Sequence, residues 1–186
     1  MKSTNLFDRT LIGAYKDEAA WDAVKTLRQV GTREVFDRAK TWCLSDDPLK
    51  RERGADIIGQ LRTVPTQKVN AFPDEAYEAL TELVLRETDP HPLSSAIAAL
   101  GHLDNPAAVP LIVRFHEHPD SDVRFNLAFA LGCYSDDPLS VGTLLQRPQP
   151  RIATARNCCA RSSRNSFLRW NVRKTMPISH CVGAVA

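Results

Sequence analysis

Apolar and polar positions return along this chain in a repeated unit. Three times an aspartate is followed twelve residues later by a glycine that ends an apolar run, and the pairs are Asp47 and Gly59, Asp89 and Gly101, and Asp120 and Gly132. Small or apolar residues between them are spaced by three and four positions, which places them on one face of a helix. A unit with fixed internal spacing predicts a solenoid, whose stacked repeats share one continuous core.

The two ends of this unit predict how its helix begins and ends. An aspartate accepts hydrogen bonds from the first free N–H groups of a helix, and Pro48 and Pro90 fit the first turn. Each glycine lies near the helix end, where glycine either relieves close packing or permits a left-handed cap.

An amphipathic segment precedes each of these helices, so the unit is a helical hairpin. The preceding segments are Thr32 to Leu44, Asp74 to Thr88, and Pro106 to His118. Asp17 to Val30 predicts the second helix of a partial N-terminal repeat, and Leu139 to Gln146 predicts the opening of a fourth repeat. No stretch alternates with period two. The predicted fold is all-α, an α-solenoid of about three helical hairpins plus a partial N-terminal one.

Charge divides the chain into two parts of opposite sign. Residues 1–146 contain 16 Lys or Arg against 22 Asp or Glu, a net charge of −6, whereas residues 147–186 contain 8 Lys or Arg and no acid. We therefore expect an N-terminal lead over 1–14, the solenoid over 15–146 and a basic atypical tail over 147–186.

The tail has three interpretations. It is a basic extension that binds nucleic acid or an acidic protein, a disordered tail, or the product of translation in a shifted reading frame. We favour the shifted frame, because back-translation permits acidic strings that look like further repeats. The coding DNA tests this hypothesis, which fails if the alternative frame holds stop codons or no repeat.

The repeat resembles a known family. Two helices per unit, a D-x-D-V-R turn and an A-x-A-L-G second helix resemble the HEAT repeat, in the PBS-lyase HEAT-like subgroup, and PDSDVRFNLAFALG (Pro119 to Gly132) matches best. The stretch GTREVFDRAKTWCLSDDPLKRERGADIIGQL is similar to the opening of a bacterial family of HEAT-repeat proteins, some encoded beside polymorphic toxins. The resemblance covers about residues 15–146. It implies an α-solenoid more strongly than any one activity, because HEAT arrays serve many functions.

Histidines and arginines are the candidate residues for chemistry in this chain. HEAT enzymes that hydroxylate a modified lysine carry His-Glu pairs on second helices, but His116, Glu117 and His118 end a first helix, so we expect no metal or cofactor. His91 and His102 are expected in turns and on the surface. Arg51 and Arg124 share one position after the turn aspartate, where a HEAT arginine often pairs with an aspartate of a neighbouring turn.

No nucleophile motif or phosphate-binding loop is present, so no catalytic residue is nominated and a non-enzyme is expected. Bilin lyases share the repeat subgroup, which makes a subunit of a bilin-lyase-like enzyme the alternative. Nucleic-acid binding through the basic tail is a further alternative, disfavoured for the solenoid by its net acidity.

The predicted function is a protein–protein interaction scaffold, with an immunity or regulatory role. Its partner-binding surface is expected where second helices place polar residues of mixed sign, at Arg53, Asp56, Gln60, Ser95, His102, Arg124 and Asn126. No run is long and apolar enough to cross a bilayer and no signal-peptide layout is seen, so a cytoplasmic protein is expected. Cys43 and Cys133 are expected to be reduced, largely buried thiols.

Overall fold

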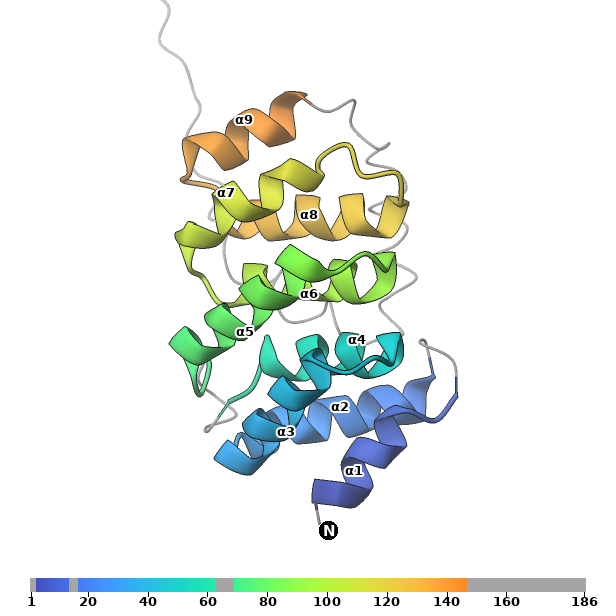
Figure 1. Ribbon diagram of the computed structural model, residues 1–186. Helices are drawn as coiled ribbons and strands as arrows, with labels where there is room; N and C mark the ends of the chain where they lie inside the picture. The colour runs from blue at the N-terminus through green and yellow to red at the C-terminus, as the bar shows by residue number, and fades with distance from the viewer. Residues whose placement is uncertain (1–2, 14–16, 63–68, 147–186) are drawn as a thin grey trace, which may run out of the picture. The chain divides into compact units, whose positions relative to one another are not determined.

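Helices account for every regular element in residues 3–13, 17–62 and 69–146, the part of the chain that the computed structural model describes. Residues 1–147 form one compact unit, and all that follows concerns this unit. The helices pair into hairpins that stack one on the next (Figure 1). The predicted all-α solenoid is confirmed. The tail predicted over 147–186 lies outside the described residues.

The helices fall into two layers. The first helices of the hairpins are α1 (Ser3–Thr10), α3 (Arg33–Cys43), α5 (Pro73–Arg86), the segment η1 (Pro106–Ala108), α7 (Val109–Ile112) and η2 (Val113–Phe115), and then α9 (Pro138–Gln146). The second helices are α2 (Glu18–Val30), α4 (Pro48–Ile58), α6 (Pro90–His102) and α8 (Ser121–Cys133). Contacts from α4 to α6 and from α6 to α8 make the second helices a continuous layer.

The turn aspartates cap the second helices as predicted. The Asp47 carboxylate accepts from the N–H of Leu49 at 3.0 Å, and that of Asp89 accepts from His91 at 3.0 Å. Asp120 accepts two N–H bonds, from Asp122 and Val123. These bonds satisfy N–H groups that have no partner inside the helix, so each hairpin turn fixes the start of its second helix.

The first helix of the third hairpin differs from the single helix predicted over 106–118. It is broken into a 3₁₀ turn, a short α-helix and a second 3₁₀ turn. Pro110 explains the break, because proline has no N–H to donate and its ring crowds the carbonyl four residues earlier. Val109 and Ile112 are nevertheless fully buried, so the apolar stripe of this segment still reaches the core.

The N-terminal hairpin is more complete than the partial repeat predicted. Residues 3–10, inside the predicted lead, form α1, which packs against α2. Phe7 is completely buried, and its ring lies 4.8 Å from that of Trp42 in an edge-on arrangement. Only Leu6 and Phe7 are large apolar residues in α1, which is too short a pattern to predict a helix from periodicity.

Two of the repeat glycines serve close packing rather than a left-handed cap. A Cβ atom built on Gly59 would lie 2.5 Å from the Cβ of Ala99, and one on Gly101 would lie 2.7 Å from the Cα of Ala130. Neither glycine has a positive φ angle. The missing side chains therefore let consecutive second helices approach each other closely.

Candidate functional site

A buried polar cluster joins the N-terminal second helices. We call it the polar spine and define it as Arg28 of α2, Arg53 and Asp56 of α4, and Ser95 of α6. The Arg53 guanidinium donates to the carbonyl of Thr10 at 3.0 Å and lies 3.4 Å from the Asp56 carboxylate. Arg28 donates to the backbone carbonyl of Asp56 at 2.7 Å. Ser95 hydrogen-bonds to the Asp56 carboxylate, so the spine spans three hairpins.

The ring of Trp21 completes the surroundings of the two arginines. The guanidinium carbons of Arg53 and Arg28 lie 5.0 and 5.7 Å from its ring centroid. A cation over an indole face is attracted by the negative charge density of the ring. Both guanidinium groups are thus held by several contacts at once, which fixes α2 against α4.

Burial dominates the ionisation of the acids in this region. It raises the pKa of Asp56, while the positive charges of Arg28 and Arg53 act in the opposite direction. Burial also raises the pKa of Glu52, together with the neighbouring Asp56 carboxylate, to about 8. Glu52 therefore carries a proton at neutral pH, and Asp56 is the carboxylate that faces the arginines.

Three of the predicted partner-binding residues are not accessible. Arg53, Asp56 and Ser95 were expected on an open surface, but their exposed fractions are 1%, 7% and 4%. The expectation of exposure is wrong because α4 packs between its neighbours: Arg53 faces Thr10 and Trp21 of the preceding hairpin. Asp56 and Ser95 face each other between α4 and α6. They hold the second helices together from inside the layer.

The other four predicted residues remain partly accessible. Gln60 and His102 occupy the same position, at the ends of α4 and α6, whereas Arg124 and Asn126 lie near the start of α8. Asn126 donates to the hydroxyl of Ser94 at 2.5 Å. The ring of His102 lies 5.1 Å from that of Phe129. The structure thus divides these residues between the two ends of the second helices.

His102 ends α6 and is partly buried, whereas an exposed turn residue was expected. Its side chain is also neutral. Burial lowers the pKa of His102 to about 3, with further lowering from the positive charges of Arg28 and Arg62. At physiological pH its ring therefore offers one donor and one acceptor, with no charge.

The arginines of the turns are structural, as predicted, but the partner of Arg51 differs from prediction. Arg51 pairs through two bonds of 2.6 and 3.0 Å with Glu87 of the next turn, not with an aspartate. It also donates to the carbonyls of Ser45 and Asp46 in its own turn. The equivalent Arg124 makes the same pair of bonds, to the carbonyls six and five residues before it.

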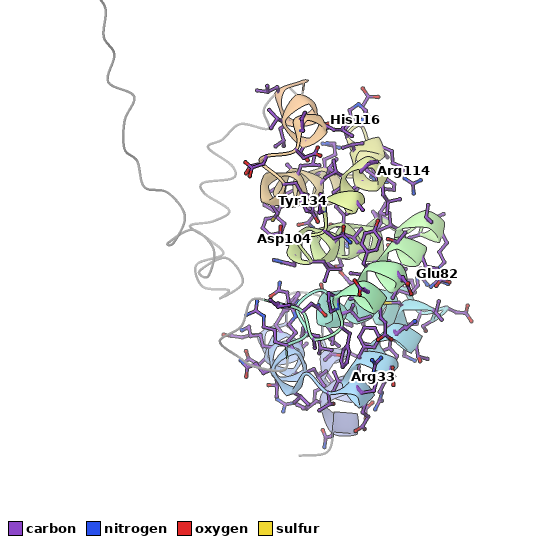
Figure 2. The ribbon with its side chains drawn as sticks, turned by 90° about the vertical axis from the view of Figure 1, so that its left-hand side faces the viewer. Arg33, Glu82, Asp104, Arg114, His116 and Tyr134 are labelled. Carbon is purple, nitrogen blue, oxygen red and sulfur yellow. The ribbon has the colours of Figure 1, made fainter. Side chains whose placement is uncertain are left out.

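The first helices carry their own inter-repeat bonds. Arg33 pairs through two bonds with Glu75, and its guanidinium carbon lies 4.0 Å from the centroid of Phe72. Arg114 donates to the carbonyl of Val84 at 3.3 Å. In Figure 2, Arg33, Glu82 and Arg114 lie along one side of the stack, opposite Asp104 and Tyr134.

The histidines with metal-like spacing do not converge. The Nε2 of His116 lies 3.8 Å from the Glu117 carboxylate, and the Nδ1 of His118 accepts from the N–H of Asp120. Within residues 3–13, 17–62 and 69–146, no three His, Cys, Asp or Glu side chains are grouped as metal ligands. No helix in the same ranges is long and apolar enough to cross a membrane.

Stacked hairpins with two helix layers define the class of helical-repeat solenoids. Residues 77–156 match the family described as HEAT repeats, so this part of the chain carries HEAT repeats. This confirms the family predicted from the D-x-D-V-R turn. The PBS-lyase-like subgroup and the bacterial family with toxin neighbours stay predictions.

A solved structure shares the fold, and a second is less similar. The X-ray structure of YibA from Escherichia coli is 20% identical, with a TM-score of 0.62, over 90% of this chain and 60% of YibA. Human deoxyhypusine hydroxylase, in complex with glycerol, is 21% identical with a TM-score of 0.49 over 73% of this chain and 44% of its own. The present chain thus spans less than two thirds of either protein. Comparison with curated protein sequences finds no match.

Proposed function

We propose that this chain is a non-catalytic scaffold that binds a protein partner in the cytoplasm, in an immunity or regulatory role. HEAT repeats generally mediate protein–protein interaction. One observation supports the scaffold most: the buried arginines and Asp56 of the polar spine join the second helices to their neighbours. Arg53 bonds to Thr10 of the preceding hairpin and to Asp56, and Asp56 bonds to Ser95 of the following one.

A helix layer held together by these buried bonds is suited to binding a protein partner. Its surface residues are held in fixed relative positions before a partner arrives, so little conformational entropy is lost on binding. Gln60 and His102 lie at equivalent helix ends, and both are uncharged polar groups at neutral pH. We propose the partner contact at this edge, which we call the second-helix edge and define as Gln60 and His102. Arg124 and Asn126 lie at the opposite edge of the same layer.

The charges of the accessible surface favour a protein over nucleic acid. The exposed side of α5 carries Asp74, Glu78 and Glu82 at successive helical turns, with Glu75 beside them. A nucleic-acid groove requires aligned lysines and arginines. The acidic side of α5 would repel a phosphate backbone, which favours a protein partner.

Photo-crosslinking in the source cells tests this proposal. A benzophenone amino acid is placed at Gln60 in the second-helix edge, and in a matched variant at Glu82 on the exposed side of α5. We expect a protein adduct from position 60 and a much weaker one from position 82. Adducts from position 82 alone would move the contact to the first helices, and adducts to nucleic acid would overturn the proposal.

A further inference from the structure

Two arginines meet beside the second-helix edge. Arg62 follows the end of α4, and its backbone N–H donates to the carbonyl of Arg28, in the last turn of α2, at 2.9 Å. The positive charges of both arginines also reach the ring of His102 at the end of α6, because both lower its pKa. We call Arg28 and Arg62 the arginine patch. Arg28 is buried in this patch and Arg62 is partly exposed, so Arg62 is the one that a partner can reach.

The buried charges beneath this patch do not cancel it. Arg28 and Arg53 face the single carboxylate of Asp56, and the neighbouring Glu52 is protonated at neutral pH. These four side chains therefore carry one net positive charge, and Arg62 adds a second at the surface. Charges that lie partly away from water attract an anion more strongly than charges in bulk solvent. The arginine patch is thus a region of positive potential.

Carbonyl groups at the helix ends could attract a cation instead, but the chain occupies them with its own donors. The carbonyl of Ile58 in α4 accepts from the side-chain amide of Asn70 at 2.7 Å. The carbonyl of Leu100 in α6 accepts from the hydroxyl of Tyr134 at 2.6 Å. The chemistry of the edge is therefore set by Arg62, whose guanidinium group donates hydrogen bonds and accepts none.

The acid that matches this patch does not come from the undescribed residues of the chain. All 22 Asp and Glu residues lie within residues 3–13, 17–62 and 69–146, so the remaining residues contain none. Residues 147–186 instead contain 8 Lys or Arg. Neither the segment that directly follows Arg62 nor the C-terminal residues can therefore supply a carboxylate side chain. A second molecule is the source that the composition leaves.

Asp104 limits the positive region along the stack. It occupies the position in its repeat that Arg62 occupies in the preceding one, three residues after the repeat glycine. Its negative charge acts on Tyr134 and on Cys133, which is exposed although it was predicted to be buried. The charge at this position thus changes from positive to negative within one repeat. A bound acid is attracted to Arg62 and repelled by Asp104, which fixes its register along the stack.

We propose that the second-helix edge binds an acidic segment of the partner protein, with an aspartate or glutamate of that segment paired with Arg62. A planar guanidinium binds a carboxylate through two parallel hydrogen bonds. The neutral side chains of Gln60 and His102 can donate to further acceptors of the same segment. This inference rests on the proposed protein-binding function and names the chemistry of the partner.

A nucleic acid fits this edge less well than an acidic protein segment. Its regularly spaced phosphates need a row of lysines and arginines. Asp104 interrupts such a row one repeat after Arg62. A protein segment needs only one acid at one position, so the change of sign along the edge selects it.

Crosslinking of the purified full-length chain to defined probes tests the proposal. A benzophenone amino acid at Gln60 labels molecules bound at this edge and ignores those bound to basic residues elsewhere. The probes are a biotinylated peptide of alternating Glu and Ala, the same peptide with Gln in place of Glu, and a single-stranded oligonucleotide of similar length. We expect saturable labelling of the Glu peptide, and about tenfold weaker labelling of the Gln peptide.

Two charge reversals at opposite ends of α4 provide the matched comparison. Arg62→Glu reverses the charge beside the second-helix edge, whereas Lys50→Glu makes the same change in the first turn of α4. Arg62→Glu is expected to weaken labelling of the Glu peptide by about tenfold, and Lys50→Glu to leave it unchanged. Arg62→Gln removes the charge without reversing it and is expected to weaken labelling about threefold. Urea unfolding checks that all three variants remain folded.

No labelling of the Glu peptide, equal labelling of the Glu and Gln peptides, or equal effects of Arg62→Glu and Lys50→Glu would overturn the proposal. Stronger labelling of the oligonucleotide than of the Glu peptide would assign the edge to nucleic acid and also overturn it. The proposed function fails separately. Absence of a protein adduct from position 60 in the source cells, with intact labelling of the Glu peptide, would reject the protein partner. A cellular adduct that Arg62→Glu leaves unchanged would reject only the acidic segment.

Discussion

The glycine contacts between second helices make a prediction with a built-in control. Gly101→Ala places a methyl carbon 2.7 Å from the Cα and 2.9 Å from the Cβ of Ala130. Favourable carbon contacts lie at about 3.5–4.0 Å, so α8 must retreat by about 1 Å from α6. Gly132→Ala adds the same methyl group to the next helix at a position where no described atom lies within 4 Å.

The magnitudes separate the two variants. Overpacking of this kind costs about 1–3 kcal/mol. Replacing a helical glycine by alanine returns up to about 1 kcal/mol. We therefore expect Gly101→Ala to lower the free energy of unfolding by about 1–2 kcal/mol. Gly132→Ala, in the last turn of α8, is expected to raise it by about 0.5 kcal/mol.

Urea unfolding of the full-length proteins, followed by far-ultraviolet circular dichroism, measures both changes. The two variants differ by one methyl group on successive second helices, so their helix propensities and effects on the unfolded chain are closely matched. A Gly101→Ala protein as stable as Gly132→Ala would refute the close-approach account of the repeat.

Other side chains give further predictions. Because the pKa of Glu52 is raised from 4.5 to about 8, the folded protein holds a proton that the unfolded chain has released, and stability falls as pH rises between these values. Between about pH 7 and 8, above the titration of His102 in either state and below that of the Cys43 thiol, we expect a loss of about 1 kcal/mol that Glu52→Gln abolishes, measured by urea unfolding. Parallel pH profiles of the two proteins would contradict this prediction. Arg53→Met should destabilise the folded protein by about 3 kcal/mol in thermal or urea unfolding, because it leaves the buried Asp56 carboxylate short of a partner. Arg124→Met, near the start of α8, should cost under about 1 kcal/mol. Equal effects of the two substitutions would contradict the role of the polar spine. Tyr134→Phe removes the 2.6 Å bond from its hydroxyl to the Leu100 carbonyl and should cost about 1 kcal/mol in the same assay, and an unchanged midpoint would contradict this.

The local features of the repeat could be predicted from the sequence because their causes are local. A turn aspartate caps the helix that directly follows it, as Asp89 does for α6. The amphipathic segment predicted over Thr32 to Leu44 contains α3, and Val35 and Phe36 on its apolar side are fully buried. The break at Pro110 has an equally local cause, and the proline within the apolar stripe was the signal for it.

The predicted site depended on distances between repeats, which spacing within one helix does not determine. The position of Arg53 along its helix predicted that it belongs to the second-helix layer. That position did not predict that only 1% of the residue is exposed. That burial follows from how closely α4 approaches its neighbours. For the close approach of α4 to α6, which brings Asp56 to Ser95, the signal available was the pairing of Gly59 with Ala99, two small residues at related positions of adjacent repeats. Which acid pairs with Arg51 likewise depends on how the turns stack, and the observed partner is Glu87.

The central claim is that the second-helix layer is a rigid surface for protein recognition, and crosslinking from two positions tests it most directly. Benzophenone amino acids at Gln60 and at Glu82 sample the second-helix edge and the exposed side of α5 in the full-length chain. The account predicts a protein adduct from position 60 and little or none from position 82. Adducts from position 82, with none from position 60, would contradict it.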